Sequence, residues 1–77
     1  MKIKVIFKAS LKRYSGNNDG VVFIDFLKGM TVNDILEKFE VNSLDVGLTL
    51  VNGAAVPKNT VLKEGDVVEL LTMLKGG

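Results

Sequence analysis

Alternating apolar and charged residues mark the beginning of the chain as a β-strand. The apolar residues recur at every second position, at Ile3, Val5, Phe7 and Ala9. This period of two predicts a strand with one face on a core and the other in water. Residues 11–20 contain Ser-Gly-Asn-Asn-Asp-Gly, a composition typical of turns. Residues 21–28 are predicted to return as an antiparallel strand, with Val22, Ile24 and Phe26 facing inward.

The segment that follows carries the signals of a short amphipathic helix. Thr31-Val32-Asn33-Asp34 is similar to a capping box, in which the Thr31 hydroxyl accepts a backbone N–H and the acidic Asp34 complements the helix dipole. Apolar residues then fall on one helical face, at Val32, Ile35, Leu36 and Phe39. Because an isolated helix of this length is marginal in water, we expect its apolar face to pack against the sheet.

Two turn signals divide the second half of the chain into short strands. The apolar residues 48–51 precede Asn52-Gly53, a strong signal for a tight turn. Pro57 indicates that the next segment is an edge strand or a loop. Residues 62–66 form a second turn signal, and a last strand is predicted from Val67 to Leu71 or beyond. Strands on both sides of one crossover helix predict an α+β fold.

The composition limits the chain to one domain and excludes several kinds of chemistry. Its 77 residues, 47% of them hydrophobic, suffice for one core, so we predict a single domain over residues 1–77. Ten Lys and Arg against nine Asp and Glu lack the positive excess that binds nucleic acid. Without His or Cys, the usual metal ligands and the usual general base are missing. We therefore expect a protein that is not an enzyme, has no catalytic residues of its own, and binds no metal or cofactor.

The N-terminal residues lack the features of a secretory signal. Met1 to Val5 alternate charged and apolar residues, without the continuous apolar core of a signal peptide. No stretch of the sequence has the length needed to cross a bilayer. We expect a cytoplasmic protein without a membrane partner.

Two groups of oxygen-bearing side chains are interpreted as surface features. Asp34, Glu37 and Glu40 lie on the polar face of the predicted helix, where solvated carboxylates are common. Residues 17–20, Asn-Asn-Asp-Gly, are similar to a fragment of a calcium-binding loop but lack its spacing and its closing Glu. We interpret them as a turn.

The sequence Lys75-Gly76-Gly77 is the remaining candidate for function. It follows closely on the last predicted strand, so residues 72–77 are expected to form a flexible tail in solvent. Two residues without side chains can pass through a narrow channel in another protein. Six extended residues reach about 20 Å, at ~3.3 Å each. An ordinary frayed terminus has the same pattern, so the dipeptide alone does not decide the function.

The order of elements and motifs resembles that of the MoaD/ThiS family of ubiquitin-like sulfur carriers. The matching features are Gly29 before the helix start at Thr31-Val32, the turns at Val51-Asn52-Gly53 and Leu62-Lys63-Glu64-Gly65-Asp66, and the terminal Gly76-Gly77. The resemblance covers the whole chain and implies a β-grasp fold, with a mixed sheet of four to five strands packed against one main helix. Residues 9–14 and the long hairpin turn resemble the small subunit of molybdopterin synthase. That branch commonly has Pro-Pro where this chain has Thr72-Met73.

The resemblance implies that partner enzymes perform the chemistry on this chain. An adenylating enzyme of the ubiquitin-activating type uses ATP to activate the carboxylate of Gly77, which becomes a thiocarboxylate. Gly76 and Lys75 thread into that enzyme. The sulfur is then donated in molybdopterin synthesis, to the large subunit of the synthase. The alternatives are a thiamine or tRNA-thiolation carrier with another sulfur-accepting enzyme, or a modifier conjugated to lysines, as in ubiquitin's Arg-Gly-Gly ending.

The resemblance also implies a docking surface for the activating enzyme. The family uses apolar residues on the sheet face near the tail, which in this sequence are Leu71, Met73, Leu74, Leu48 and Leu50. For Leu48, Leu50 and Leu74, a place in the core is an equally good interpretation. A third hypothesis is a β-grasp interaction domain with an inert tail.

Overall fold

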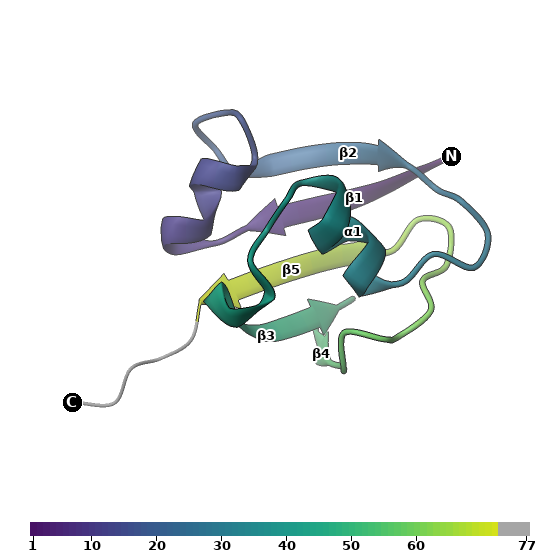
Figure 1. Ribbon diagram of the computed structural model, residues 1–77. Coiled ribbons are helices and arrows are strands. Elements are labelled where there is room, and N and C mark those ends of the chain that lie inside the picture. The colour runs from purple at the N-terminus through teal and green to yellow at the C-terminus, as the bar shows by residue number, and fades with distance from the viewer. Residues whose placement is uncertain (73–77) are drawn as a thin grey trace.

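The computed structural model describes residues 1–72, which form a five-stranded sheet with one main helix across one face (Figure 1). The elements in chain order are β1 (Lys2–Phe7), the 3-10 helix η1 (Ala9–Tyr14), β2 (Val21–Asp25), α1 (Val32–Lys38), the 3-10 helix η2 (Ser43–Asp45), β3 (Val46–Val51), β4 (Ala54–Ala55) and β5 (Val67–Thr72). This arrangement confirms the predicted α+β architecture.

The sheet is mixed, with the order β2-β1-β5-β3-β4. β1 and β5 are parallel neighbours at its centre, whereas β2 pairs antiparallel with β1, and β3 pairs antiparallel with β5. The short β4 covers part of the outer edge of β3. Because β2 runs opposite to β1 and β5, the end of β2 and the end of β5 lie at opposite ends of the sheet (Figure 1).

The core lies between the sheet and α1. The fully buried side chains come from both layers and from η1, and the largest of them are Phe7, Ile3, Leu11, Ile35, Leu70, Val5, Val32 and Val68. The rings of Phe7 and Phe39 meet edge to face, with 5.1 Å between their centroids. The inward positions predicted for Ile3, Val5 and Phe7 are therefore confirmed.

The helix begins with the predicted capping box. The Oγ1 atom of Thr31 accepts from the backbone N–H of Asp34 at 3.3 Å, and the Thr31 N–H donates to Asp34 Oδ2 at 2.8 Å. Together these bonds satisfy two backbone donors at the helix start. The predicted apolar face is confirmed at Val32, Ile35 and Leu36, which are buried.

The prediction that Ala9 continues the first strand inward is wrong. Ala9 is exposed and has a φ of 51°, which turns the chain off β1 and into η1. The turn brings Leu11 into the core, where its side chain is fully buried. The later part of the loop is the predicted turn, in which Asn17 Oδ1 accepts from the Gly20 N–H at 2.8 Å.

An irregularity in the pairing of β3 with β5 determines which side chains of β3 point into the core. The register shifts between Val46 and Leu48, which buries both Val46 and Thr49. Thr49 tolerates this position because its hydroxyl donates to the carbonyl of Val56. Leu48 and Leu50 consequently lie on the opposite face of the sheet.

Candidate functional site

The candidate site is built around the end of β5. Thr72, which the sequence analysis assigned to the tail, is instead the last residue of this strand and pairs with Val46. β5 lies between β1 and β3, so its end is in the middle of one end of the sheet. The site residues predicted beyond it lie outside the described residues, namely Met73, Leu74, Lys75, Gly76 and Gly77.

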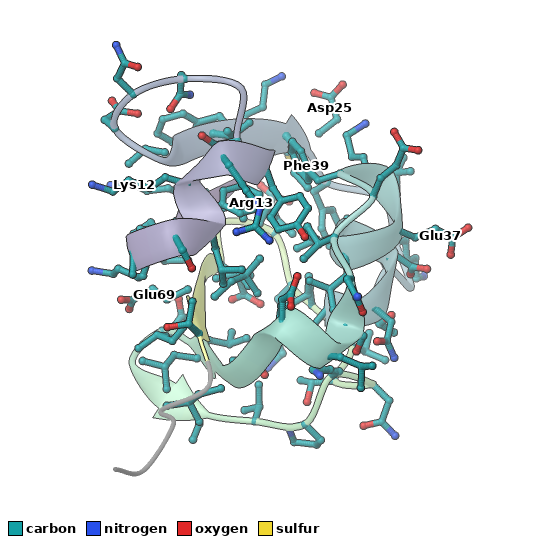
Figure 2. The ribbon with its side chains drawn as sticks, turned by 60° about the vertical axis from the view of Figure 1, so that its left-hand side comes forward. Lys12, Arg13, Asp25, Glu37, Phe39 and Glu69 are labelled. Atoms are coloured by element: carbon teal, nitrogen blue, oxygen red, sulfur yellow. The ribbon has the colours of Figure 1, made fainter. Side chains whose placement is uncertain are left out.

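Both 3-10 helices flank this end of the sheet. The N–H of Lys8, just before η1, donates to the Leu70 carbonyl at 3.0 Å, while η2 leads directly into β3. Asp45 of η2 accepts from the Tyr14 hydroxyl at 2.9 Å and from Arg13 Nη2 at 3.2 Å. These three residues, the Arg13–Tyr14–Asp45 cluster, join the two helices; Arg13 is labelled in Figure 2.

The sequence analysis did not identify the Arg13–Tyr14–Asp45 cluster. Arg13 and Tyr14 were noted only for the family resemblance, and Asp45 lies 31 residues beyond Tyr14 in the sequence. The guanidinium of Arg13 also stacks on the Tyr14 ring, 4.7 Å from its centroid. The cluster is partly exposed, so its ion pair adds at most about 1 kcal/mol to stability. Its main effect is to fix the position of η1 against η2.

The face of the sheet away from α1 is open and largely apolar. Leu48 pairs with Leu71, and Leu50 pairs with Glu69. Leu48 is 44% exposed and Phe23, further along the same face, is 60% exposed. We call this surface the open face. It brings together three of the five predicted docking residues, Leu71, Leu48 and Leu50, and the core interpretation is wrong for Leu48. Their contact with a partner stays a prediction.

Charges of both signs lie within the open face, on the central strands β1 and β5. Lys8 Nζ lies 3.6 Å from the carboxylate of Glu69, which is labelled in Figure 2. Lys4 Nζ lies 6.0 Å from the centroid of the Phe23 ring. Exposed pairs of this kind contribute little to stability. The exposed apolar side chains of this face are the feature that is typical of a protein-docking surface.

The described residues offer little for catalysis. Within residues 1–72, no group of three or more His, Cys, Asp and Glu side chains could hold a metal ion.

Lys2, through its hydrogen bond and its charge, holds the pKa of Asp25 below the usual value, and both side chains of this ion pair are exposed. The same part of the chain contains no helix long and apolar enough to span a membrane.

Known proteins with similar sequences or folds complete this description. The chain matches the model of the ThiS family over residues 5–77. No curated protein sequence matches it.

Several solved structures share the fold, and three of them are given as examples. The crystal structure of Haloferax volcanii SAMP1, small archaeal modifier protein 1, is 22% identical with a TM-score of 0.75, covering 100% of both chains. The solution structure of the Haloferax volcanii HVO 2177 protein is 21% identical with a TM-score of 0.80, over 100% of this chain and 87% of the other. A chain in the complex of subunits 1 and 2 of the Helicobacter pylori molybdopterin-converting factor is 26% identical with a TM-score of 0.65, over 100% of both.

The structural likenesses confirm the ubiquitin-like β-grasp fold that the resemblance implied. The family match extends from the first strand to the two terminal glycines. The sheet order, the capped helix and this match agree, and the chain belongs to the ThiS family of ubiquitin-like proteins.

Proposed function

We propose that this chain carries sulfur as a thiocarboxylate on Gly77 and donates it in the synthesis of molybdopterin. The observation that carries the proposal is the family match over residues 5–77, which includes Gly76 and Gly77. The likeness to a chain in a complex of the two subunits of a molybdopterin-converting factor supports the choice of pathway. The resemblance of residues 9–14 to the small subunit of molybdopterin synthase points the same way.

The proposed chemistry takes place on one carboxyl group. A carboxylate is a poor acyl electrophile, so an adenylating enzyme of the ubiquitin-activating type first transfers AMP from ATP to Gly77 and releases pyrophosphate. Hydrosulfide, or a sulfur donor equivalent to it, then displaces AMP and leaves the thiocarboxylate. ATP is bound and used by the partner, and no cofactor is bound by this chain.

In this proposal, the described part of the chain supplies the surface that binds the partner enzymes. Leu48, Leu50 and Leu71 supply apolar surface that becomes buried against the activating enzyme. Gly76 and Lys75 thread into its active site, where glycine allows close approach of the backbone. The same surface then docks the large subunit of molybdopterin synthase, and we propose the cytoplasm as the compartment.

The second candidate function is a ubiquitin-like modifier. The ending Lys75-Gly76-Gly77 is similar to the Arg-Gly-Gly of ubiquitin, and SAMP1 has the same fold. In this function the activated carboxyl of Gly77 forms an amide with lysines of other proteins. The two functions share activation and differ in the nucleophile that follows.

Reconstitution with purified partners tests the proposal. The chain is incubated with its activating enzyme, ATP, a sulfur donor, the large subunit of molybdopterin synthase and the pterin precursor, and molybdopterin is measured by the fluorescence of its oxidised product. We expect product with this chain and none with a variant that lacks Gly77. Thiocarboxylate without molybdopterin would assign another acceptor, and Gly-Gly remnants on lysines in cell digests would favour the modifier. Failure to form thiocarboxylate would overturn the proposal.

A further inference from the structure

The open face extends beyond Leu48 and Leu71, to the half of the sheet formed by β1 and β2. Residues that pair across a sheet place their side chains on the same face, so the register shows which side chains share this surface. Lys4 pairs with Phe23 of β2 and with Val67 of β5, and Val67 points to the same face as Leu71, four residues further along β5. Because β1 lies between β2 and β5 (Figure 1), Lys4 is inside the open face and not at its margin.

The surroundings of Lys4 on this face are mainly apolar. Phe23 on one side is 60% exposed, and Val67 on the other side is half-buried. The next row of paired residues is also half-buried and consists of Val21, Ile6, Glu69 and Leu50. Lys4 is therefore a cation set among apolar side chains.

The ammonium group of Lys4 has no carboxylate partner within residues 1–72. The side chain is half-buried, and its Nζ atom lies 6.0 Å from the centroid of the Phe23 ring, at the limit of a cation–π contact. Its charge is therefore balanced mainly by water. A protein that covers this half of the face removes that water, which costs free energy unless an opposite charge takes its place.

The charges of the open face leave Lys4 as the unbalanced group. The strands contribute Lys2, Lys4, Asp25 and Glu69 to this face, and Lys8 follows β1 directly. Lys2 is paired with Asp25, and Lys8 is paired with Glu69, so each of these pairs has no net charge. The described face consequently has an excess of one positive charge. A complementary surface is negative where it meets Lys4.

A protein that docks on Leu48 and Leu71 is large enough to cover Lys4 as well. Lys4 pairs with Val67, which precedes Leu71 by four residues, and β5 separates β1 from β3. With a rise of ~3.3 Å per residue and ~4.8 Å between strands, Lys4 and Leu48 lie about 16 Å apart on the face. An interface of ordinary size covers about 800 Å² of each partner, a patch roughly 30 Å across. Docking around Leu48 therefore extends to Lys4.

We propose that Lys4 is a specificity-determining residue for the activating enzyme, which carries a carboxylate facing the Lys4 ammonium group and an apolar side chain facing Phe23. The inference rests on the proposed function, in which that enzyme docks on the open face. The carboxylate replaces the water that Lys4 loses, so neither charge is buried without a partner. An enzyme with a basic or apolar group at this place is rejected, because it leaves Lys4 covered and without a counter-charge.

Calorimetric titration of the chain with its purified activating enzyme, in the absence of ATP, tests the proposal. Lys4→Glu should raise the Kd at least tenfold, because two carboxylates then face each other. Lys4→Gln removes the charge without repulsion, and it should raise the Kd roughly threefold and weaken its dependence on salt. Lys4→Arg keeps the charge and should bind nearly as well as the wild-type chain.

Lys38→Glu is the matched control for charge reversal. It changes the net charge by the same amount at an exposed position on α1, which covers the other face of the sheet. We expect it to leave the Kd unchanged. Circular dichroism establishes that each variant is folded before it is titrated. Equal Kd values for folded Lys4→Glu, Lys4→Gln and Lys38→Glu chains would overturn the proposal.

A charge-reversal scan of the activating enzyme locates the proposed carboxylate. One of its surface Asp or Glu residues, replaced by Lys, should restore binding of the Lys4→Glu chain and weaken binding of the wild-type chain. If no such replacement restores binding, the proposal is overturned. Thiocarboxylate formation by the wild-type chain separates the two claims: if it forms while Lys4→Glu binds normally, only this inference fails. A wild-type chain that neither binds the enzyme nor forms thiocarboxylate overturns the proposed function together with this inference.

Discussion

Asp66 joins the two turns at the end of the sheet opposite Thr72. Replacing its side chain should lower the free energy of unfolding substantially. Asp66 is 7% exposed. Its carboxylate accepts from Asn52 Nδ2 at 2.8 Å and from the Lys63 N–H at 2.7 Å. Asn52 Oδ1 in turn accepts from the Val67 N–H at 2.9 Å. The network thereby connects the β3–β4 turn to the turn that precedes β5.

The substitution Asp66→Ala removes both hydrogen bonds to the carboxylate. Each bond to a charged acceptor contributes about 1.5–3 kcal/mol, and the two donors lose their partner in a site with little water. Asp66 is slightly exposed, so water can partly replace the lost acceptor, and we take the low end of this range for each of the two bonds. The expected loss in free energy of unfolding is then about 3 kcal/mol. This is a large part of the 5–15 kcal/mol typical of a domain. For a chain of this size it lowers Tm by roughly 12–24 °C.

Urea denaturation followed by circular dichroism measures this loss. Glu64→Ala is the matched control, because Glu64 is an exposed carboxylate in the same turn. We expect the control to change the free energy of unfolding by less than about 0.5 kcal/mol. A loss for Asp66→Ala no larger than that of Glu64→Ala would refute the reasoning. Below its Tm, the Asp66→Ala protein should still accept sulfur, because the network is far from Thr72.

Two further substitutions have matched controls in this chain. Gly20→Ala places a Cβ atom 2.4 Å from the Phe7 carbonyl oxygen, whereas Gly16→Ala meets open space at a similar positive φ. By chemical denaturation, Gly16→Ala should lose about 1 kcal/mol and Gly20→Ala at least ~2 kcal/mol more, and equal losses would contradict the close packing of Gly20 against Phe7. Leu48→Glu on the open face should slow thiocarboxylate formation by roughly tenfold or more, measured by quenched mass spectrometry. Val61→Glu, at an exposed position that pairs with Thr31 at the start of α1, should leave the rate unchanged; equal rates for both variants would exclude docking through Leu48.

The regular elements were predictable because their signals are local. The alternation at Ile3, Val5 and Phe7 needs only one strand with one buried face. The helix start at Thr31 needs only the reciprocal bonds with Asp34, three residues further along. Such signals depend on neighbours in the sequence, so the pattern contains them before the chain is folded.

The parts that the sequence did not predict depend on contacts between distant segments. Nothing in the pattern around Ala9 indicates its positive φ, which is held because Leu11 packs into a core formed by the whole sheet. The burial of Thr49 between two leucines that are not buried follows from a register shift against β5 and from a bond to Val56. The apolar content of residues 48–51 could therefore predict a strand, but it could not predict which of its side chains are buried.

The candidate site was predictable only in part for the same reason. The pairing of Leu48 with Leu71 and the position of Asp45 beside Tyr14 require the assembled sheet. The edge position of β2 likewise follows only from the assembled sheet. The glycines at 76 and 77 were identified from the sequence, and their role in sulfur transfer stays a prediction.

The most direct test of the central claim is the intact mass of the chain after activation, with fragmentation to locate any change. The protein is incubated with its activating enzyme, ATP and a sulfur donor. The account predicts a mass increase equal to the replacement of one oxygen by sulfur, confined to the C-terminal fragment at Gly77 and dependent on ATP. An unchanged mass with an activating enzyme that is active on a known substrate, or sulfur at any other residue, would contradict it.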